Sequence, residues 1–231
     1  MKTVGIIGGI GPESTIEYYR GILASYRRRR PDGSSPSIIL NSVSVQKLLA
    51  LMDKDDLPGV IDYLVPEINR LAAAGADFGL IAANTPHIVF DEIQQQSPIP
   101  LLSIVEATCA EAKARGIQRA GLLGTRFTMQ ADFYPAVFSR EGIALVVPAT
   151  DQQAYIHDKY VNELLKDIFL PSTRERLWEI IQTMKERQQI EAVVLAGTEL
   201  PLILHQDEAA GLPLLDTTQI HVEATVARLL S

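Results

Sequence analysis

Two stretches of this sequence, Leu80-Ile81-Ala82-Ala83-Asn84-Thr85 and Val194-Leu195-Ala196-Gly197-Thr198-Glu199, share one pattern. Each is an apolar run that breaks at a small residue and continues into polar residues, and Gly197 follows Ala83 by 114 positions. A second pair, Gly5-Ile6-Ile7-Gly8 and Gly121-Leu122-Leu123-Gly124, repeats at an offset of 116 residues. Two independent pairs at nearly the same offset predict a duplicated α/β unit with matched loops.

Short apolar segments alternate with helical patterns along the whole chain, beginning with a strand expected at 3–8 and a helix at 13–29. This alternation predicts parallel sheets with right-handed crossovers. We therefore expect an α/β fold of two similar, doubly wound parallel-sheet domains related by pseudo-twofold symmetry. The matched loops would then face each other across a cleft between the domains, which is where we expect the active site.

The expected domain boundaries make the first domain discontinuous. It comprises residues 1–98 and 210–231, and the second domain comprises residues 99–209, with a strand at 99–102 entering it. The helix expected at 217–230 returns to the first domain with one apolar face, formed by Ile220, Ala224, Ala227 and Leu230.

Composition limits the function classes. The 231 residues carry a net charge of −7 at pH 7, which argues against nucleic acid or an anionic membrane as partner. The one cysteine, Cys109, lies in a helical pattern, so neither an internal disulfide nor a thiol metal cluster is expected. No His, Asp or Glu spacing suggests a metal site, and no apolar stretch reaches membrane-spanning length, so a cytoplasmic protein is predicted.

Four loops at expected strand ends are rich in Gly, Thr and Asn, at 8–15, 83–87, 124–128 and 197–199. Helix starts with backbone N–H groups and hydroxyls suit a carboxylate ligand, although the same residue types are ordinary helix caps. The glycines at 8–11 do not form the dinucleotide fingerprint, because the spacing is not G-x-G-x-x-G and Pro12 interrupts the loop.

Taken in order, Gly8-Gly9-Ile10-Gly11-Pro12-Glu13-Ser14-Thr15, Asn84-Thr85-Pro86-His87, Leu123-Gly124-Thr125-Arg126-Phe127-Thr128 and Gly197-Thr198-Glu199 resemble the aspartate/glutamate racemase family. The resemblance runs the whole length of the chain. It implies two α/β domains with the active site between them, an isomerase that needs no pyridoxal phosphate or other cofactor, and a homodimer. In that family one cysteine takes the substrate's α-proton and a second cysteine returns a proton on the other face.

The resemblance aligns the two catalytic cysteines with Ala83 and Gly197. Neither a methyl group nor a hydrogen atom can move a proton, so two-thiol racemisation is not expected of this chain. The positions that bind substrate in the family do have suitable residues in this chain. The resemblance implies that a small acidic amino acid or dicarboxylate binds at Gly9, Asn84, Thr85, Thr125, Thr128, Lys166, Thr198 and Glu199. The arginine that relatives carry after the second strand is replaced by Gln46 or Lys47.

Three interpretations remain open. The chain could be a natural or deliberately inactivated racemase-family protein with a substrate-shaped pocket. It could instead be an isomerase or lyase of small carboxylic acids that recruits other acids and bases, for which His87, Glu199 and Tyr18 are candidates. It could also be a non-catalytic protein that senses an acidic amino acid.

Overall fold

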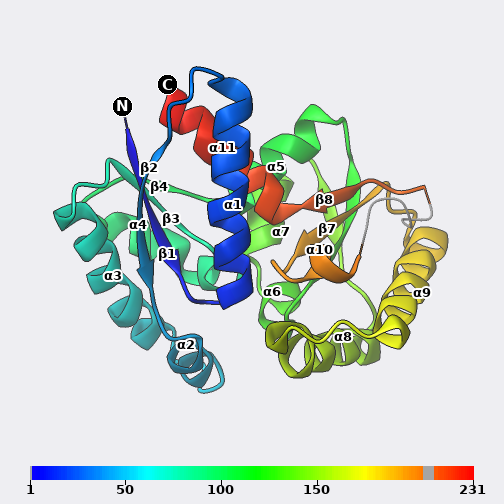
Figure 1. Cartoon of the computed structure of the whole chain (residues 1–231). Coiled ribbons are helices and arrows are strands. Elements are labelled where there is room, and N and C mark those ends of the chain that lie inside the picture. Colours follow the sequence, from blue (N-terminus) through cyan, green and yellow to red (C-terminus); the bar gives the residue numbers. More distant parts are fainter. Residues whose placement is uncertain (1, 205–210) are drawn as a thin grey trace. The chain divides into compact units, whose positions relative to one another are not determined.

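The computed structural model describes residues 2–204 and 211–231 (Figure 1). The chain divides into two compact units, which are described separately. Unit 1 comprises Met1–Ile104 with Thr218–Ser231, and unit 2 comprises Val105–Thr217. The boundary expected at residues 209–210 lies outside the described residues.

Unit 1 is built on a four-stranded parallel sheet in the order β2-β1-β3-β4. Its strands are β1 (Thr3–Gly8), β2 (Ser37–Ser42), β3 (Phe78–Ile81) and β4 (Leu101–Leu102). Its helices are α1 (Pro12–Arg29), α2 (Val45–Met52), α3 (Leu57–Ala73), the 3-10 helix η1 (Thr85–Val89), α4 (Phe90–Gln96) and α11 (Thr217–Leu230), whose first residue belongs to unit 2.

Helices cover both faces of this sheet (Figure 1). Val4 and Ile6 of β1 belong to a buried core with side chains of α1 and α11, among them Tyr18 and Val222. Alternate residues of a strand face opposite sides. On the other side a Cβ added to Gly5 would touch Leu71 of α3 at 3.0 Å, so glycine lets this helix approach the strand closely.

Two sequence expectations for unit 1 need correction. Residues 99–102, which were expected to enter the second domain, contain β4, and β4 pairs with β3 of the first sheet. The buried apolar residues of α11 are Val222, Val226 and Leu229. Of the four expected residues, Leu230 packs against the same core, whereas Ile220, Ala224 and Ala227 are not part of this cluster. The first sheet therefore extends further along the chain than residue 98.

Unit 2 has a parallel sheet in the order β6-β5-β7-β8. Its strands are β5 (Arg119–Gly124), β6 (Ala144–Val146), β7 (Ala192–Ala196) and β8 (Leu214–Asp216). Its helices are α5 (Ile104–Ala114), which begins on the last residue of unit 1, α6 (Arg126–Gln130), α7 (Phe133–Arg140), α8 (Thr150–Asn162), the 3-10 helix η2 (Leu164–Lys166), α9 (Pro171–Gln188) and α10 (Leu200–Ile203). Leu123, Val193 and Leu195 pack with α8 and α9 in one core.

The two units repeat the same topology, which confirms the predicted α/β fold of two similar parallel-sheet domains. Counted within its own unit, each sheet has the strand order 2-1-3-4. Ile7 pairs with Ile81 in the first sheet, and Leu123 pairs with Leu195 at the equivalent place in the second. The sequence offsets of 116 and 114 thus connect residues that are partners in the same register.

Candidate functional site

The matched loops leave adjacent strands at the same edge of each sheet. In unit 1 the amide of Ala82 donates to the carbonyl oxygen of Ile7 at 2.9 Å, so the loops after β1 and β3 start side by side. In unit 2 Gly124 pairs with Ala196, and the loops after β5 and β7 start side by side in the same way. Both are carboxyl edges of parallel sheets, where ligands bind in folds of this class.

The loop after β1 is a tight turn held by its own hydrogen bonds. Gly9 has φ of 80°, and a Cβ there would collide with the carbonyl oxygen of Val43. Its amide donates to the hydroxyl of Thr15 at 2.8 Å. Gly8 also needs to be a glycine, because a Cβ would lie 2.5 Å from Cγ2 of Thr15. Gly9 therefore meets a structural requirement of this turn.

The loop after β3 places small and polar residues in a buried setting. Ala83 is 5% exposed and Asn84 is 4% exposed, while Thr85 is half-buried. Asn84 precedes η1, and its carbonyl oxygen accepts a hydrogen bond from the amide of His87 at 3.0 Å. No acid or base stands at position 83 itself.

Two histidines lie behind this loop, in the core of unit 1. Nε2 of His87 accepts a hydrogen bond from the amide of Ile104 at 3.3 Å, and the ring stacks on Phe90. Burial lowers the pKa of His87 to about 4, partly opposed by the carbonyl groups of Ala83 and Asn84. His87 is therefore neutral at pH 7.

His221 is the second of these histidines. Its Nδ1 lies 2.8 Å from the hydroxyl of Tyr18, and its Nε2 lies 3.0 Å from the carbonyl oxygen of Leu102. Burial, followed by the influence of His87, lowers the pKa of His221 to about 3. The Tyr18 hydroxyl is thus bonded inside the core of unit 1.

The loop after β5 forms a helix cap, which was one of the two roles expected for its threonines. Thr125 is the N-cap of α6, where its hydroxyl oxygen accepts a hydrogen bond from the amide of Thr128 at 3.3 Å. The two hydroxyl oxygens lie 3.1 Å apart. Thr128 also packs under Gly124, whose added Cβ would lie 3.1 Å from Cβ of Thr128. Both threonines are buried, and they follow Gly124, which pairs with Ala196 of β7.

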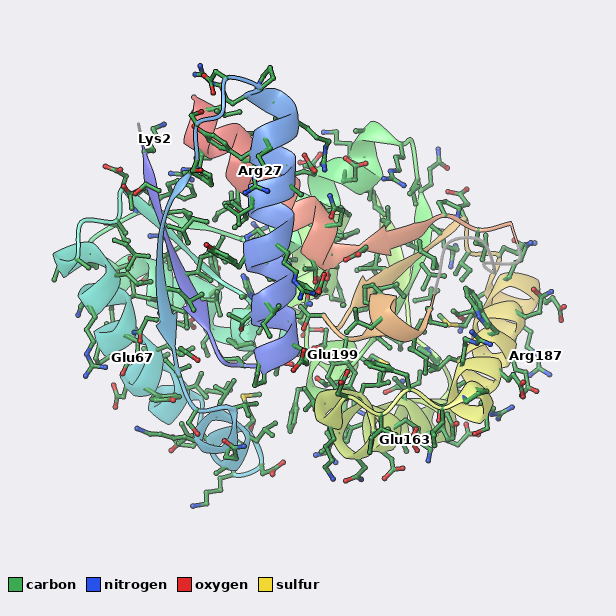
Figure 2. All side chains as sticks on the ribbon, viewed as in Figure 1. Lys2, Arg27, Glu67, Glu163, Arg187 and Glu199 are labelled. Carbon is green, nitrogen blue, oxygen red and sulfur yellow. The ribbon has the colours of Figure 1, made fainter. Side chains whose placement is uncertain are left out.

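The loop after β7 contains a buried cluster around Gly197. The Tyr160 hydroxyl on α8 donates a hydrogen bond to Oε2 of Glu199, and the Thr198 hydroxyl donates to the same oxygen at 2.9 Å. Tyr160 is 5% exposed and Glu199, which is labelled in Figure 2, is 2% exposed. Burial, then the negative charge of Glu199, raises the pKa of Tyr160 well above its usual value.

The ring of Tyr160 fills the space that a side chain at position 197 would need. A Cβ added to Gly197 would lie closer to Cε2 of Tyr160 than real Cβ atoms approach, and 3.0 Å from the hydroxyl oxygen. Gly197 is not among the glycines with positive φ, so its backbone does not itself require glycine. Sequence reasoning missed Tyr160, because no local signal on α8 links it to a loop 37 residues later.

The remaining candidates lie away from these loops in the chain. Lys166 is exposed and ends η2, and its amide donates to the carbonyl oxygen of Glu163 at 2.9 Å. Lys47, in the segment expected to replace the missing arginine, holds its ammonium group 4.2 Å from the ring centroid of Tyr63. In the described ranges, 2–204 and 211–231, no group of three or more His, Cys, Asp or Glu side chains is placed to hold a metal ion. Nor is any helix of those ranges long and apolar enough to cross a membrane.

Residues 7–225 match the family model described as Asp/Glu/Hydantoin racemase. The chain belongs to this family. Broad specificity amino-acid racemase RacX of Bacillus subtilis (strain 168) is 27% identical over 99% of this chain and 98% of its own. Two solved structures align over all of both chains. A candidate Asp/Glu racemase of Yersinia pestis has 32% identity and a TM-score of 0.90, and an aspartate racemase homologue of Pyrococcus horikoshii has 31% and 0.86.

Family membership and the two-unit fold together confirm the resemblance seen in the motifs. The racemase-family fold places the motif loops at the carboxyl edges of two matched sheets, as each unit shows by itself. At the two loop positions where the resemblance puts thiols, this racemase-family chain has a methyl group at Ala83 and a tyrosine ring against Gly197.

Proposed function

We propose that this racemase-family protein binds a small acidic amino acid or dicarboxylate at the carboxyl-edge loops and acts at its α-carbon without thiol-based racemisation. The observation that supports the proposal is the presence of Ala83 and Gly197, where the resemblance places thiols, in loops that contain the polar residues Asn84, Thr85 and Thr198. Backbone amides and hydroxyls of such loops are suited to a carboxylate. The relatives named above as amino-acid and Asp/Glu racemases support an amino acid as ligand.

The proposed binding residues are the positions expected from the sequence: Gly9, Asn84, Thr85, Thr125, Thr128, Lys166, Thr198 and Glu199. Thr85, which is half-buried and is the first residue of η1, is the position chosen for the test. The hydroxyls of Thr198 and Thr125 bond Glu199 and Thr128, and they would test the same loops in unit 2. Assembly as a homodimer and a cytoplasmic location remain predictions from the sequence.

Calorimetric titration with the L and D forms of aspartate and glutamate, and with succinate, tests the proposal. Thr85→Val should weaken binding by about 1–3 kcal/mol, since a charged acceptor would lose a hydrogen-bond partner. Thr183→Val is the matched control, because Thr183 is on α9 and its hydroxyl bonds only the preceding helical turn at the Glu179 carbonyl, 2.8 Å away. A protein that binds none of these ligands at millimolar concentration would contradict the proposal.

A further inference from the structure

The ring of Tyr160 lies where a side chain at position 197 would otherwise extend. Gly197 does not have positive φ, and the three heavy atoms nearest to an added Cβ all belong to Tyr160. The Tyr160 hydroxyl oxygen lies 3.0 Å from the point where that side chain would begin. A phenol group thus stands beside the place from which the family's second thiol would extend.

We propose that Tyr160, paired with Glu199, replaces the missing second thiol and moves the α-proton of the bound amino acid on one face only. The inference rests on the proposed function, since it requires the ligand to bind at these loops. A phenol at neutral pH is protonated and needs an acceptor behind it before it can take a second proton. Glu199 is that acceptor, because its Oε2 already receives the Tyr160 hydrogen bond.

The proton step balances as a relay. The Cα–H bond of the substrate breaks, and its electron pair stays on the substrate as a carbanion delocalised into the α-carboxyl group. The proton passes to the Tyr160 oxygen while the Tyr160 proton passes to Oε2 of Glu199. Reversal returns the hydroxyl proton of Tyr160 to the same face, and when that hydroxyl proton has exchanged with D₂O before reversal, the α-carbon receives deuterium.

Thr198 positions the acceptor in this relay. Its hydroxyl donates to the same carboxylate oxygen at 2.9 Å, which fixes Glu199 toward the tyrosine. Because Ala83 carries only a methyl group, no second carrier stands at the other thiol position. The relay therefore predicts α-proton exchange with retention of configuration and no racemisation.

Proton NMR of L- and D-aspartate and of L- and D-glutamate in D₂O, with the enantiomers then separated by chiral chromatography, tests the relay. One enantiomer should lose its α-proton signal without inversion. Tyr160→Phe should slow this exchange by about 10²–10⁴-fold, the usual contribution of a general acid or base, while calorimetric binding is retained. Tyr155→Phe is the matched control on the same helix, since the Tyr155 ring instead lies 5.7 Å from the Lys159 ammonium.

Variants of Glu199 separate proton transfer from packing. Glu199→Gln keeps an oxygen to accept the tyrosine hydrogen bond but cannot take the proton, so exchange should be lost at saturating ligand concentration although the protein stays folded. Glu199→Asp restores a carboxylate and should recover part of the rate. Cys109→Ser removes the single, buried thiol and should leave the rate unchanged.

The outcomes are distinguishable. Binding without exchange in the unaltered protein, or equal exchange rates with Tyr160→Phe, would overturn the relay and leave the proposed binding function standing. Inversion at a rate equal to exchange would also overturn it, because it would reveal a second carrier. Absence of binding by all four amino acids and by succinate would overturn both proposals.

Discussion

A side chain introduced at position 197 would have to displace the ring of Tyr160. Gly197→Ala should therefore lower the free energy of unfolding by about 1–3 kcal/mol, the cost of overfilling a packed core. The backbone does not oppose the alanine, since Gly197 lacks positive φ. Urea unfolding measures the change.

The same substitution in a protein that lacks the Tyr160 ring tests whether this ring causes the loss of stability. In a Tyr160→Leu protein, Gly197→Ala should lower the free energy of unfolding by a smaller amount. The difference between the two losses is the coupling energy of a double-mutant cycle. An equal cost in both backgrounds would mean that Tyr160 is not the obstacle at position 197.

Residues differ in how far the sequence reveals them. The assignment of Ala83 and Gly197 to the family's thiol positions rests on the motifs that contain Asn84 and Thr198, and it stays a prediction. The Tyr160–Glu199 hydrogen bond joins residues 39 apart and depends on how α8 packs against β7. No local pattern predicts such a contact.

At the scale of elements, α11 shows why an apolar pattern can point to the wrong face. Ile220, Ala224 and Ala227 have helical spacing, but the buried side carries Val222, Val226 and Leu229. The same side also holds His221 and Thr225, whose burial is possible because both are hydrogen-bonded. Because the buried face contains hydrogen-bonded polar residues, a search for apolar residues at helical spacing does not identify it.

The histidines of η1 and α11 make the stability of unit 1 depend on pH. The pKa values of His87 and His221 are lowered to about 4 and about 3, so the unfolded chain binds more protons than the folded chain below pH 6.5. Stability is fully present above pH 6.5 and falls as the pH drops toward 4. Each imidazole contributes a slope of at most about 1.4 kcal/mol per pH unit.

Urea unfolding between pH 7 and pH 4 checks this dependence. His221→Gln removes one titrating group, so its unfolding free energy should fall less steeply with decreasing pH than that of the unaltered protein. His157→Gln is the control, because His157 is only partly buried and lies on α8 of unit 2, outside the core of unit 1. An unchanged slope in His221→Gln would contradict the assignment.

At the scale of the whole molecule, the repeat and the parallel topology could be predicted because the central strands of both sheets are buried and mainly apolar. Central strands such as β1 and β7 are continuous apolar runs, which give a strong signal. The limits of the sheets could not be predicted, since β4 has two residues and β8 has three. Strands this short become recognisable only through their pairing with β3 and β7.

Restoring both thiols tests the alignment of the two matched loops in one experiment. Inversion of an α-carbon needs a proton carrier on each face. Ala83→Cys alone should therefore racemise aspartate or glutamate together with the Tyr160 relay, whereas Gly197→Cys alone should give no racemisation. The pair should also fail while Tyr160 occupies the space beside position 197. The triple variant Ala83→Cys, Gly197→Cys, Tyr160→Leu should racemise, with strong non-additivity between the two thiols.

Chiral chromatography of the amino acid, together with α-proton exchange in D₂O, measures the outcome of this restoration. Tyr160→Leu alone is the control, and it should show neither exchange nor inversion because it retains no carrier at either position. Absence of racemisation by Ala83→Cys alone would argue against Tyr160 as the carrier on the other face, and racemisation by Gly197→Cys alone would show that another group of this chain serves the face of Ala83. A folded triple variant that binds aspartate but exchanges no α-proton would show that Ala83 and Gly197 are not the two proton-transfer positions, and would favour a protein that only binds its ligand.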